Sequence, residues 1–279
     1  MFIPPTLLLN DRFRLVEFQL NYVLARCEPR KIRAALKSLP RTLPDAYKDV
    51  FTRIERQGPD RKELVIKIVS WIFHARRPLK MTELREAIAV EPGDTELDKD
   101  DLLAPGFVVE ISESLISYDD GAGTVSFSHF TVHEFLRSSQ ATLVLPSVDI
   151  SKVCLTYLGF TEFPGFARGR EHWHSIKELL RKYGFLEYAL KFWGSHTRDA
   201  EKDEDIQKIV LTLLASENTR YGIQIYRIQM MDDYLPFPWV SDFTRGLTSL
   251  HTLANEGLAT TCKLLLHLKE NQNDTYLPS

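Results

Sequence analysis

Apolar residues recur with a helical period along most of the chain, and the segment from residue 107 to residue 127 departs from that period. Before this segment, one helix face is formed by Leu43, Tyr47, Val50, Phe51 and Ile54. A second face of the same spacing follows the Gly58–Pro59 break. Within the segment, three short runs are rich in strand-forming residues: Phe107–Val109, Leu115–Tyr118 and Thr124–Phe127. The pattern predicts a mainly α-helical protein with a small β element.

The last two of these runs are separated by Asp119–Gly123, a turn sequence, and they predict a β-hairpin. Ahead of it we expect a helix with Thr82 as N-cap and Glu83 in the first turn, burying Leu84, Ala87 and Ile88. Another helix is expected from about Thr131. Helices followed by a hairpin within such a short stretch are the layout of a winged helix.

Composition limits the setting in which the chain works. Its 279 residues suffice for two domains, and a formal net charge of −3 predicts no overall attraction to nucleic acid or to an anionic membrane. The chain has no apolar run long enough to span a membrane, and its start lacks the basic region of a signal peptide. Three widely spaced cysteines fit a reducing compartment. We therefore expect a soluble, cytoplasmic protein.

Sequence motifs for catalysis are missing. None of the 13 glycines is followed by lysine, so the chain has no Walker A loop, and it contains no Gly-x-Ser-x-Gly elbow. His129 and His133 have the spacing of two zinc ligands, but no third ligand is evident. His172–His174 is interpreted as an aromatic cluster, and Ile228–Asp233 as a polar loop. The chain is predicted not to be an enzyme and to need no cofactor, metal or small-molecule substrate.

Winged helices often bind DNA, and this possibility depends on basic surface. The predicted wing carries Asp119 and Asp120, and the helix Thr131–Gln140 carries Glu134 beside Arg137. One local basic cluster, at Arg76, Arg77 and Lys80, is explained as a complement to the dipole at a helix C-terminus. Nucleic acid is therefore disfavoured as a partner.

Several segments together resemble one family. They are Asn10–Leu24, Ile32–Ile54 (IRAALKSLPRTLPDAYKDVFTRI), Trp71–Val90 (WIFHARRPLKMTELREAIAV), Ser126–Ser138 (SFSHFTVHEFLRS), Lys152–Phe160, Tyr183–His196 and Thr248–Leu266 (TSLHTLANEGLATTCKLLL). In this order they resemble the region that follows the NACHT ATPase in fungal STAND proteins of the NACHT–ankyrin type, which are switch ATPases linked to non-self recognition and programmed cell death. The last segment looks like a first ankyrin repeat, with Thr248–His251 capping its first helix and Gly257 ending it.

The resemblance implies four segments: a helical segment at 1–57 that follows an ATPase core, a winged helix at 58–145, a helical linker at 146–240 and a partial ankyrin repeat with tail at 241–279. It implies a regulatory, protein-interaction fragment whose winged helix locks the ATPase in a full-length relative. The partner would be a NACHT ATPase core in cis or in trans. Two alternatives remain open, a stand-alone ankyrin-type adaptor and a winged-helix DNA-binding regulator.

The resemblance also draws attention to His129. In related switch ATPases a histidine just after the hairpin contacts the nucleotide phosphate, within a His-Asp pair. Here the pair reads His129–Phe130, so part of that hydrogen bonding is missing. His129 is therefore expected to sense phosphate only with an ATPase core present, and otherwise to cap or pack the start of a helix.

Overall fold

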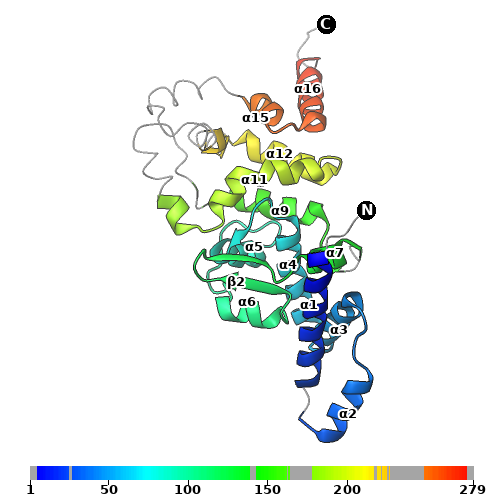
Figure 1. Cartoon of the computed structure of the whole chain (residues 1–279). Coiled ribbons are helices and arrows are strands. Elements are labelled where there is room, and N and C mark those ends of the chain that lie inside the picture. The colour runs from blue at the N-terminus through cyan, green and yellow to red at the C-terminus, as the bar shows by residue number, and fades with distance from the viewer. Residues whose placement is uncertain are drawn as a thin grey trace.

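The computed structural model describes residues 5–24, 27–138, 143–161, 163, 178–216, 219–220, 222–224, 226 and 248–274. These residues form an elongated, mainly α-helical molecule with one small antiparallel sheet near its middle (Figure 1). The N-terminal helices project as an arm at one end, and the last two helices lie at the other end. The predicted fold class, mainly α with a small β-hairpin, is confirmed.

The arm consists of α1 (Pro5–Leu24), α2 (Pro29–Lys37) and α3 (Leu43–Arg56). Thr42 caps α3 by accepting a hydrogen bond from the Asp45 amide at 3.3 Å, as expected for a threonine before a helix. The predicted apolar face of α3 is buried from Tyr47 to Ile54. This face joins the arm to the rest of the core.

The next elements alternate in the order of a winged helix. They are α4 (Pro59–His74), β1 (Leu79–Lys80), α5 (Met81–Ala89), α6 (Pro105–Ile111), β2 (Ile116–Asp119), β3 (Thr124–Phe127) and α7 (Phe130–Ser138). The predicted hairpin is present, with Ile116 opposite Phe127 and Asp119 opposite Thr124. The sheet order is β1-β3-β2, so β3 lies in the middle. The short strand β1, which the sequence patterns did not reveal, pairs Leu79 with Val125.

Two local predictions were wrong. Residues 107–109 belong to helix α6 and not to a strand, because Pro105 occupies the first helical turn and Val108 and Ile111 form a buried helical stripe. Thr82 is not an N-cap, since α5 already begins at Met81 and Lys80 is the capping residue. The expected first-turn Glu83 and the buried Leu84, Ala87 and Ile88 are confirmed.

Helix α7 returns after the wing and packs against α3 of the arm. The Tyr47 hydroxyl lies 2.8 Å from the Thr131 hydroxyl in a buried hydrogen bond, and the rings of Phe51 and Phe135 stack with centroids 6.1 Å apart. The arm is therefore attached to the winged helix through the helix that follows the wing.

A second helical region follows, composed of α9 (Ser147–Leu158), α11 (Leu186–Asp199) and α12 (Glu204–Ala215). Helix α9 packs against α4 on one side and against α11 and α12 on the other, as Figure 1 shows. The charged stretch 198–205 covers the end of α11, the turn at 200–203 and the start of α12. There Asp203 caps α12 by accepting from the Asp205 and Ile206 amides, each at 3.0 Å.

The chain then forms a helical hairpin from α15 (Ser249–Asn255) and α16 (Ala259–Asp274). As predicted, Thr248 caps α15 together with His251, and Gly257 follows the helix with a φ of +71°, a conformation that favours glycine. Glu201, in the turn before α12, accepts from the Thr260 and Thr261 amides at the start of α16, at 2.6 and 3.0 Å, and so joins the hairpin to the second helical region. The helical hairpin is thus present, and its assignment to an ankyrin repeat stays a prediction.

A pair of leucine substitutions tests the position of the core. Leu84 is fully buried in α5, whereas Leu36 on α2 is 54% exposed. We expect Leu84→Ala to lower the free energy of unfolding by about 2–5 kcal/mol through lost burial and a cavity. Leu36→Ala should change it by less than about 0.5 kcal/mol. Urea denaturation of both variants checks this, and similar losses for the two would contradict the packing described.

Candidate functional site

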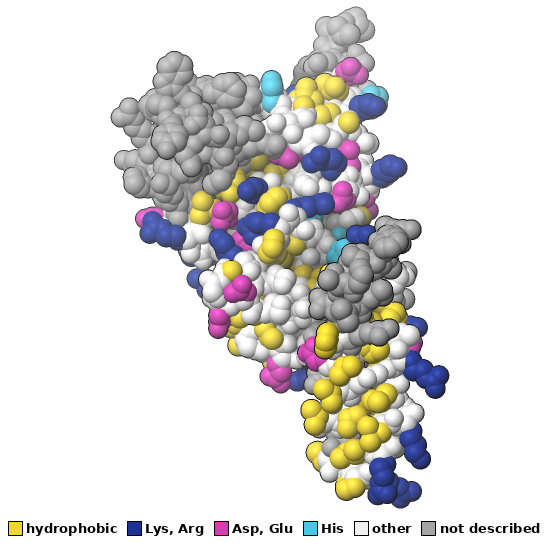
Figure 2. All heavy atoms as spheres, viewed as in Figure 1, with side chains coloured by type: hydrophobic (Ala, Val, Ile, Leu, Met, Phe, Trp, Pro, Cys, Tyr) yellow, Lys and Arg dark blue, Asp and Glu magenta, His cyan; other side chains and the backbone are white. Residues whose placement is uncertain are grey.

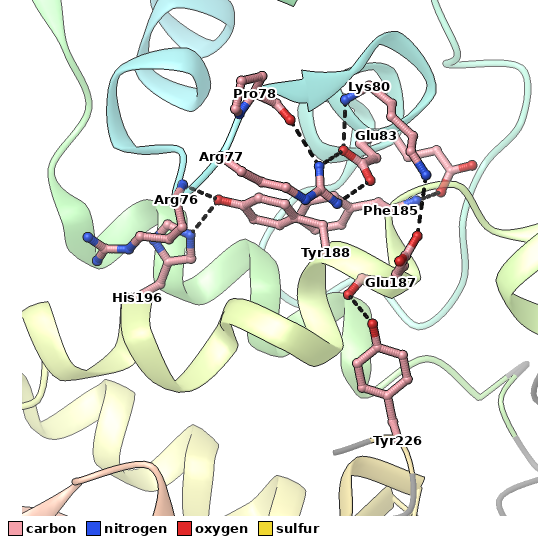
Figure 3. A network of polar contacts seen from close by, with 11 residues as sticks. Arg76, Arg77, Pro78, Lys80, Glu83, Phe185, Glu187, Tyr188, His196 and Tyr226 are labelled. Atoms are coloured by element: carbon pink, nitrogen blue, oxygen red, sulfur yellow. Dashed lines mark hydrogen bonds and ion pairs between the residues drawn. The ribbon is translucent and has the colours of Figure 1, made fainter. Parts of the chain in front are cut away.

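Charged and polar side chains are concentrated where the winged helix meets the second helical region. Arg76 and Arg77 follow α4, Glu83 and Glu86 lie on α5, and Tyr157, Tyr188 and His196 come from α9 and α11. We call these seven residues the joint. Figure 3 shows most of them, with side chains from the two regions pointing toward one another. Burying a charged group costs free energy unless the group is paired, so each buried carboxylate of the joint must have partners for its oxygens.

Glu83 is the first buried carboxylate of the joint, with no exposed side-chain surface. Its two oxygens accept from the two terminal nitrogens of Arg77, both at 2.7 Å, in a bidentate ion pair. One oxygen also accepts from the Lys80 amide at 2.7 Å, which closes the start of α5. The pKa of Arg77 is raised, chiefly because Glu83 hydrogen-bonds to it. Glu83 thus holds Arg77 in a fixed orientation.

The Arg77 guanidinium in turn contacts the second helical region. It lies 5.2 Å from the ring centre of Tyr188 and 5.9 Å from that of Phe192, both on α11. A cation over an aromatic face is attracted by the ring quadrupole, and arginine is well suited to such stacking. The Glu83–Arg77 pair of the winged helix therefore packs as a unit against α11.

Glu86 is the second buried carboxylate, and all its described partners belong to the other region. It accepts from the Gly184 amide at 2.8 Å, from the Phe185 amide at 3.0 Å, and from the Tyr157 hydroxyl. The two amides lie just before α11, where backbone N–H groups lack partners within the helix. Gly184 approaches closely, since an added Cβ would lie 3.1 Å from the Thr82 Cβ. Burial raises the pKa of Tyr157, so its hydroxyl stays a donor.

Tyr188 and His196 form the third contact of the joint. The Arg76 amide donates to the Tyr188 hydroxyl at 3.0 Å, and this hydroxyl lies 2.9 Å from Nε2 of His196. Burial, with the nearby positive charge of Arg76, lowers the pKa of His196 to about 3. The imidazole is then neutral at physiological pH, and its Nε2 can accept the tyrosine proton. Trp71 of α4 packs edge-on to both rings, at 6.4 and 6.3 Å.

More exposed contacts surround this buried group. Arg76 donates to the Ser195 carbonyl at 3.1 Å and pairs with Asp199, while Lys80 pairs with Glu187 at 3.3 Å. The hydroxyl of Tyr226 lies 3.5 Å from the Glu187 carbonyl (Figure 3). Exposed pairs of this kind contribute little to stability, so the buried carboxylates determine the strength of the joint.

His129, the candidate phosphate sensor, lies outside the joint at the start of α7. Its Nδ1 accepts from the Thr131 amide at 3.3 Å and lies 2.7 Å from the Thr131 hydroxyl. This is the helix-start contact expected of His129 without an ATPase core. Its Nε2 is buried, and no partner for it is found among the described residues. A role in phosphate sensing stays a prediction.

His133 has a different environment from His129. Its ring stacks on Phe73 at 4.7 Å, and burial lowers its pKa. In the described part of the chain, no group of three His, Cys, Asp or Glu side chains has the arrangement of a metal site. The segments 172–174 and 228–233, interpreted from sequence as an aromatic cluster and a polar loop, lie outside the described residues.

Sequence patterns located part of the joint without revealing its purpose. The cluster of Arg76, Arg77 and Lys80 is visible in the sequence, where it is interpreted as a complement to the dipole at the C-terminus of α4. Glu83 was expected only as a first-turn acid. Glu86 and Tyr188 have no local sequence signal, since their partners are about 70 to 120 residues away or lie on the backbone. The one sequence clue is that Glu83 and Glu86 stand next to the apolar residues Leu84 and Ala87 of α5.

Comparison with known proteins supports the central domain. Residues 54–143, which are 90 of the 279 residues, match the family model described as GPI inositol-deacylase, winged helix domain. The matched segment runs from the end of α3 to just beyond α7 and contains the whole three-stranded sheet. No curated protein and no solved structure matches the chain. Among the described helices, none has the length and apolar character required to cross a bilayer.

Breaking the Glu83–Arg77 pair should destabilise the protein strongly. We expect Arg77→Met to cost about 3–5 kcal/mol, because it leaves the Glu83 carboxylate buried without its guanidinium. Adding Glu83→Gln should recover part of this loss, since a neutral amide can still accept from the Lys80 amide. Lys202→Met, at an exposed site, serves as control. Chemical denaturation measures all three, and equal losses for the single and double variants would refute the assigned coupling.

The neutral, buried His196 makes stability depend on pH. The unfolded state gains a proton as pH falls below about 6.5, whereas folded His196 resists protonation until about pH 3. Stability should therefore fall with decreasing pH across this window, by up to about 1.4 kcal/mol per pH unit for this residue. The lowered pKa values of His74 and His133 act in the same direction.

The substitution His196→Gln isolates this contribution, because glutamine can place an amide near the Nε2 position. We expect the variant to have a shallower loss of stability between about pH 6.5 and pH 4.5 than the unmodified protein. The matched control is His267→Gln, on an exposed part of α16. Urea midpoints measured across the pH range decide the matter, and parallel curves for His196→Gln and the unmodified protein would count against a buried neutral imidazole.

Proposed function

We propose that the chain is a regulatory, protein-interaction module of a STAND-type signalling protein and that it works without catalysis of its own. The observation that carries the proposal is the distribution of apolar residues on α1. A helix that is apolar on two opposite faces is normally buried on both. Among the residues that the structure describes, one face of α1 is covered and the opposite face is exposed.

The inner face of α1 packs on α3. Phe18 is buried there, with its ring edge-on to Tyr47 at 5.1 Å, and Leu15 packs beside it. The opposite face carries Phe13, Val16 and Leu20, which we call the outer stripe; Phe13 is 70% and Leu20 56% exposed. Figure 2 shows hydrophobic side chains gathered over this part of the arm. Contiguous exposed apolar surface of this kind usually marks an interaction site.

The proposed occupant of the outer stripe is a NACHT ATPase core, supplied in cis or in trans. The sequence resemblance places α1 directly after that core in STAND relatives, and the family match at residues 54–143 supports the winged helix that would hold it closed. The location proposed for this role is the cytoplasm, and the process is non-self recognition and programmed cell death.

The joint supports a regulatory role for the winged helix. Arg77, which Glu83 holds in place, packs on α11, and Glu86 binds the two amides just before that helix, so a displacement of the second helical region would draw the winged helix with it. The α15–α16 hairpin, proposed as the start of an ankyrin array, packs on α12 of the same region. A partner bound to the α15–α16 hairpin would thereby act on the winged helix, which is proposed to hold the ATPase core closed.

DNA binding, the alternative function of a winged helix, receives little support from the described surface. The helix directly before the hairpin, α6, contains no lysine or arginine and carries Glu110, while Asp119 and Asp120 lie at the wing. Phosphate contacts dominate the affinity of proteins for DNA, and they require cationic groups.

The stand-alone adaptor, the other alternative function, differs from the proposed module in needing no ATPase core.

Binding to an ATPase core tests the proposal directly. We expect the chain to bind a purified NACHT core of a STAND relative, and Phe13→Glu with Leu20→Glu to weaken this binding by roughly 2–4 kcal/mol, because both side chains would lie in the contact. Leu268→Glu, also at an exposed leucine but on α16, should have no effect. Calorimetry measures the affinities. Lack of binding, or unchanged binding by the stripe variant, would reject the core as the occupant.

The same preparation tests the absence of catalysis. The chain alone should not hydrolyse ATP above the level of a mock purification, because it has no Walker A loop. Turnover that follows the chain through successive purification steps would contradict the proposal.

A further inference from the structure

We propose that the free end of the arm binds the anionic surface of a lipid bilayer. This end comprises the last residue of α1, helix α2 and the turn after it, and we call it the basic tip: Leu24, Arg30, Arg33, Leu36, Lys37 and Arg41. The inference goes beyond the proposed function, and it does not require an ATPase core.

The first observation is a local excess of positive charge. Residues 27–41 contain five cations, Arg30, Lys31, Arg33, Lys37 and Arg41, against the single carboxylate of Glu28. Lys31 pairs with Glu28 at 2.5 Å. For the other four cations, no ion pair is found within the described residues, and all four are exposed. The net charge of −3 for the whole chain conceals this concentration at one end.

The second observation is the arrangement of these cations on the helix. Arg30, Arg33 and Lys37 follow the spacing i, i+3, i+7, so they share one face of α2, away from the buried Ala35. Helices that lie on membrane surfaces carry such a Lys/Arg face, which attracts anionic headgroups and is combined with apolar side chains that insert. The face is solvent-exposed along its length and available for contact.

The third observation is that exposed leucines accompany the cations. Leu24 is 75% exposed at the end of α1, and Leu36 is 54% exposed on α2 next to Lys37. Each would enter the apolar part of the interface while the long arginine and lysine side chains reach the phosphates. Electrostatic attraction and apolar insertion are the two contributions from which peripheral membrane binding is built.

The shape of the tip favours a bilayer over other anionic partners. In Figures 1 and 2 the arm projects from the body and ends in a convex surface, with lysine and arginine side chains at its edge. A partner helix would require a groove, and a nucleic acid gains little from exposed leucines. A bilayer with anionic headgroups accepts a convex tip that carries both cations and leucines.

The test uses the full chain and lipid vesicles. We expect co-sedimentation with vesicles of phosphatidylcholine and phosphatidylserine, not with vesicles of phosphatidylcholine alone, and a loss of binding as salt is raised. The variant Arg30→Glu/Arg33→Glu/Lys37→Glu should lower the partition coefficient at least on the order of 100-fold, since each cation near the surface contributes about fivefold. Leu24→Ser/Leu36→Ser should lower it by a smaller factor.

A matched control reverses three exposed lysines at the other end of the molecule, Lys202→Glu/Lys263→Glu/Lys269→Glu, and should leave partitioning near that of the unmodified chain. If the charge reversal at the tip prevents folding, as seen by circular dichroism, the glutamine versions of the same three positions replace it. Equal binding to neutral vesicles, or equal losses for the two triple variants, would overturn the proposal. Tighter binding to duplex DNA or to polyglutamate than to anionic vesicles would overturn it as well.

Discussion

Two carboxylates that face away from water hold this molecule together along its length. Glu83 and Glu86 lie one helical turn apart on α5, and between them they are bound by a guanidinium, a tyrosine hydroxyl and three backbone amides. A carboxylate in such a position is tolerated only when its partners are in place. The contact between the winged helix and the second helical region is therefore specific in its geometry, whereas apolar packing alone would allow the two regions to slide.

The winged helix is attached to its two neighbours, the arm and the second helical region, in different ways. On the arm side, the attachment of α3 to α7 is mostly apolar and aromatic, with Tyr47 and Thr131 as a buried polar pair. On the other side, aromatic packing of Trp71 on Phe185 and Tyr188 is combined with buried ion pairs and hydrogen bonds. The winged helix at residues 54–143 thus lies between an attachment with few buried polar groups and one that contains two buried carboxylates. This difference matters for regulation, because buried ionised groups make the second attachment sensitive to pH and to the substitution of single charges.

Periodicity in the sequence was enough to predict the helical faces and the hairpin, because each depends on residues close together in the chain. The face of α3 and the pairing of residues 116–119 with 124–127 are of this kind. The strand-like run Phe107–Val109 misled the prediction, since β-branched and aromatic residues also suit a short buried helix. The joint was beyond local patterns. Its partners are far apart in sequence, and Glu86 is bound by the backbone, whose amides leave no trace in residue identity.

The way Glu86 is bound has a consequence for how the sequence of such a protein can drift. A salt bridge between two side chains, such as Lys80 with Glu187, tolerates a paired exchange in which both charges swap. The amides of Gly184 and Phe185 cannot become acceptors, so the side chain at position 86 must keep its acceptor oxygens whatever its neighbours become. Among homologues, positions 80 and 187 should therefore covary, whereas position 86 should stay glutamate or glutamine and position 184 small.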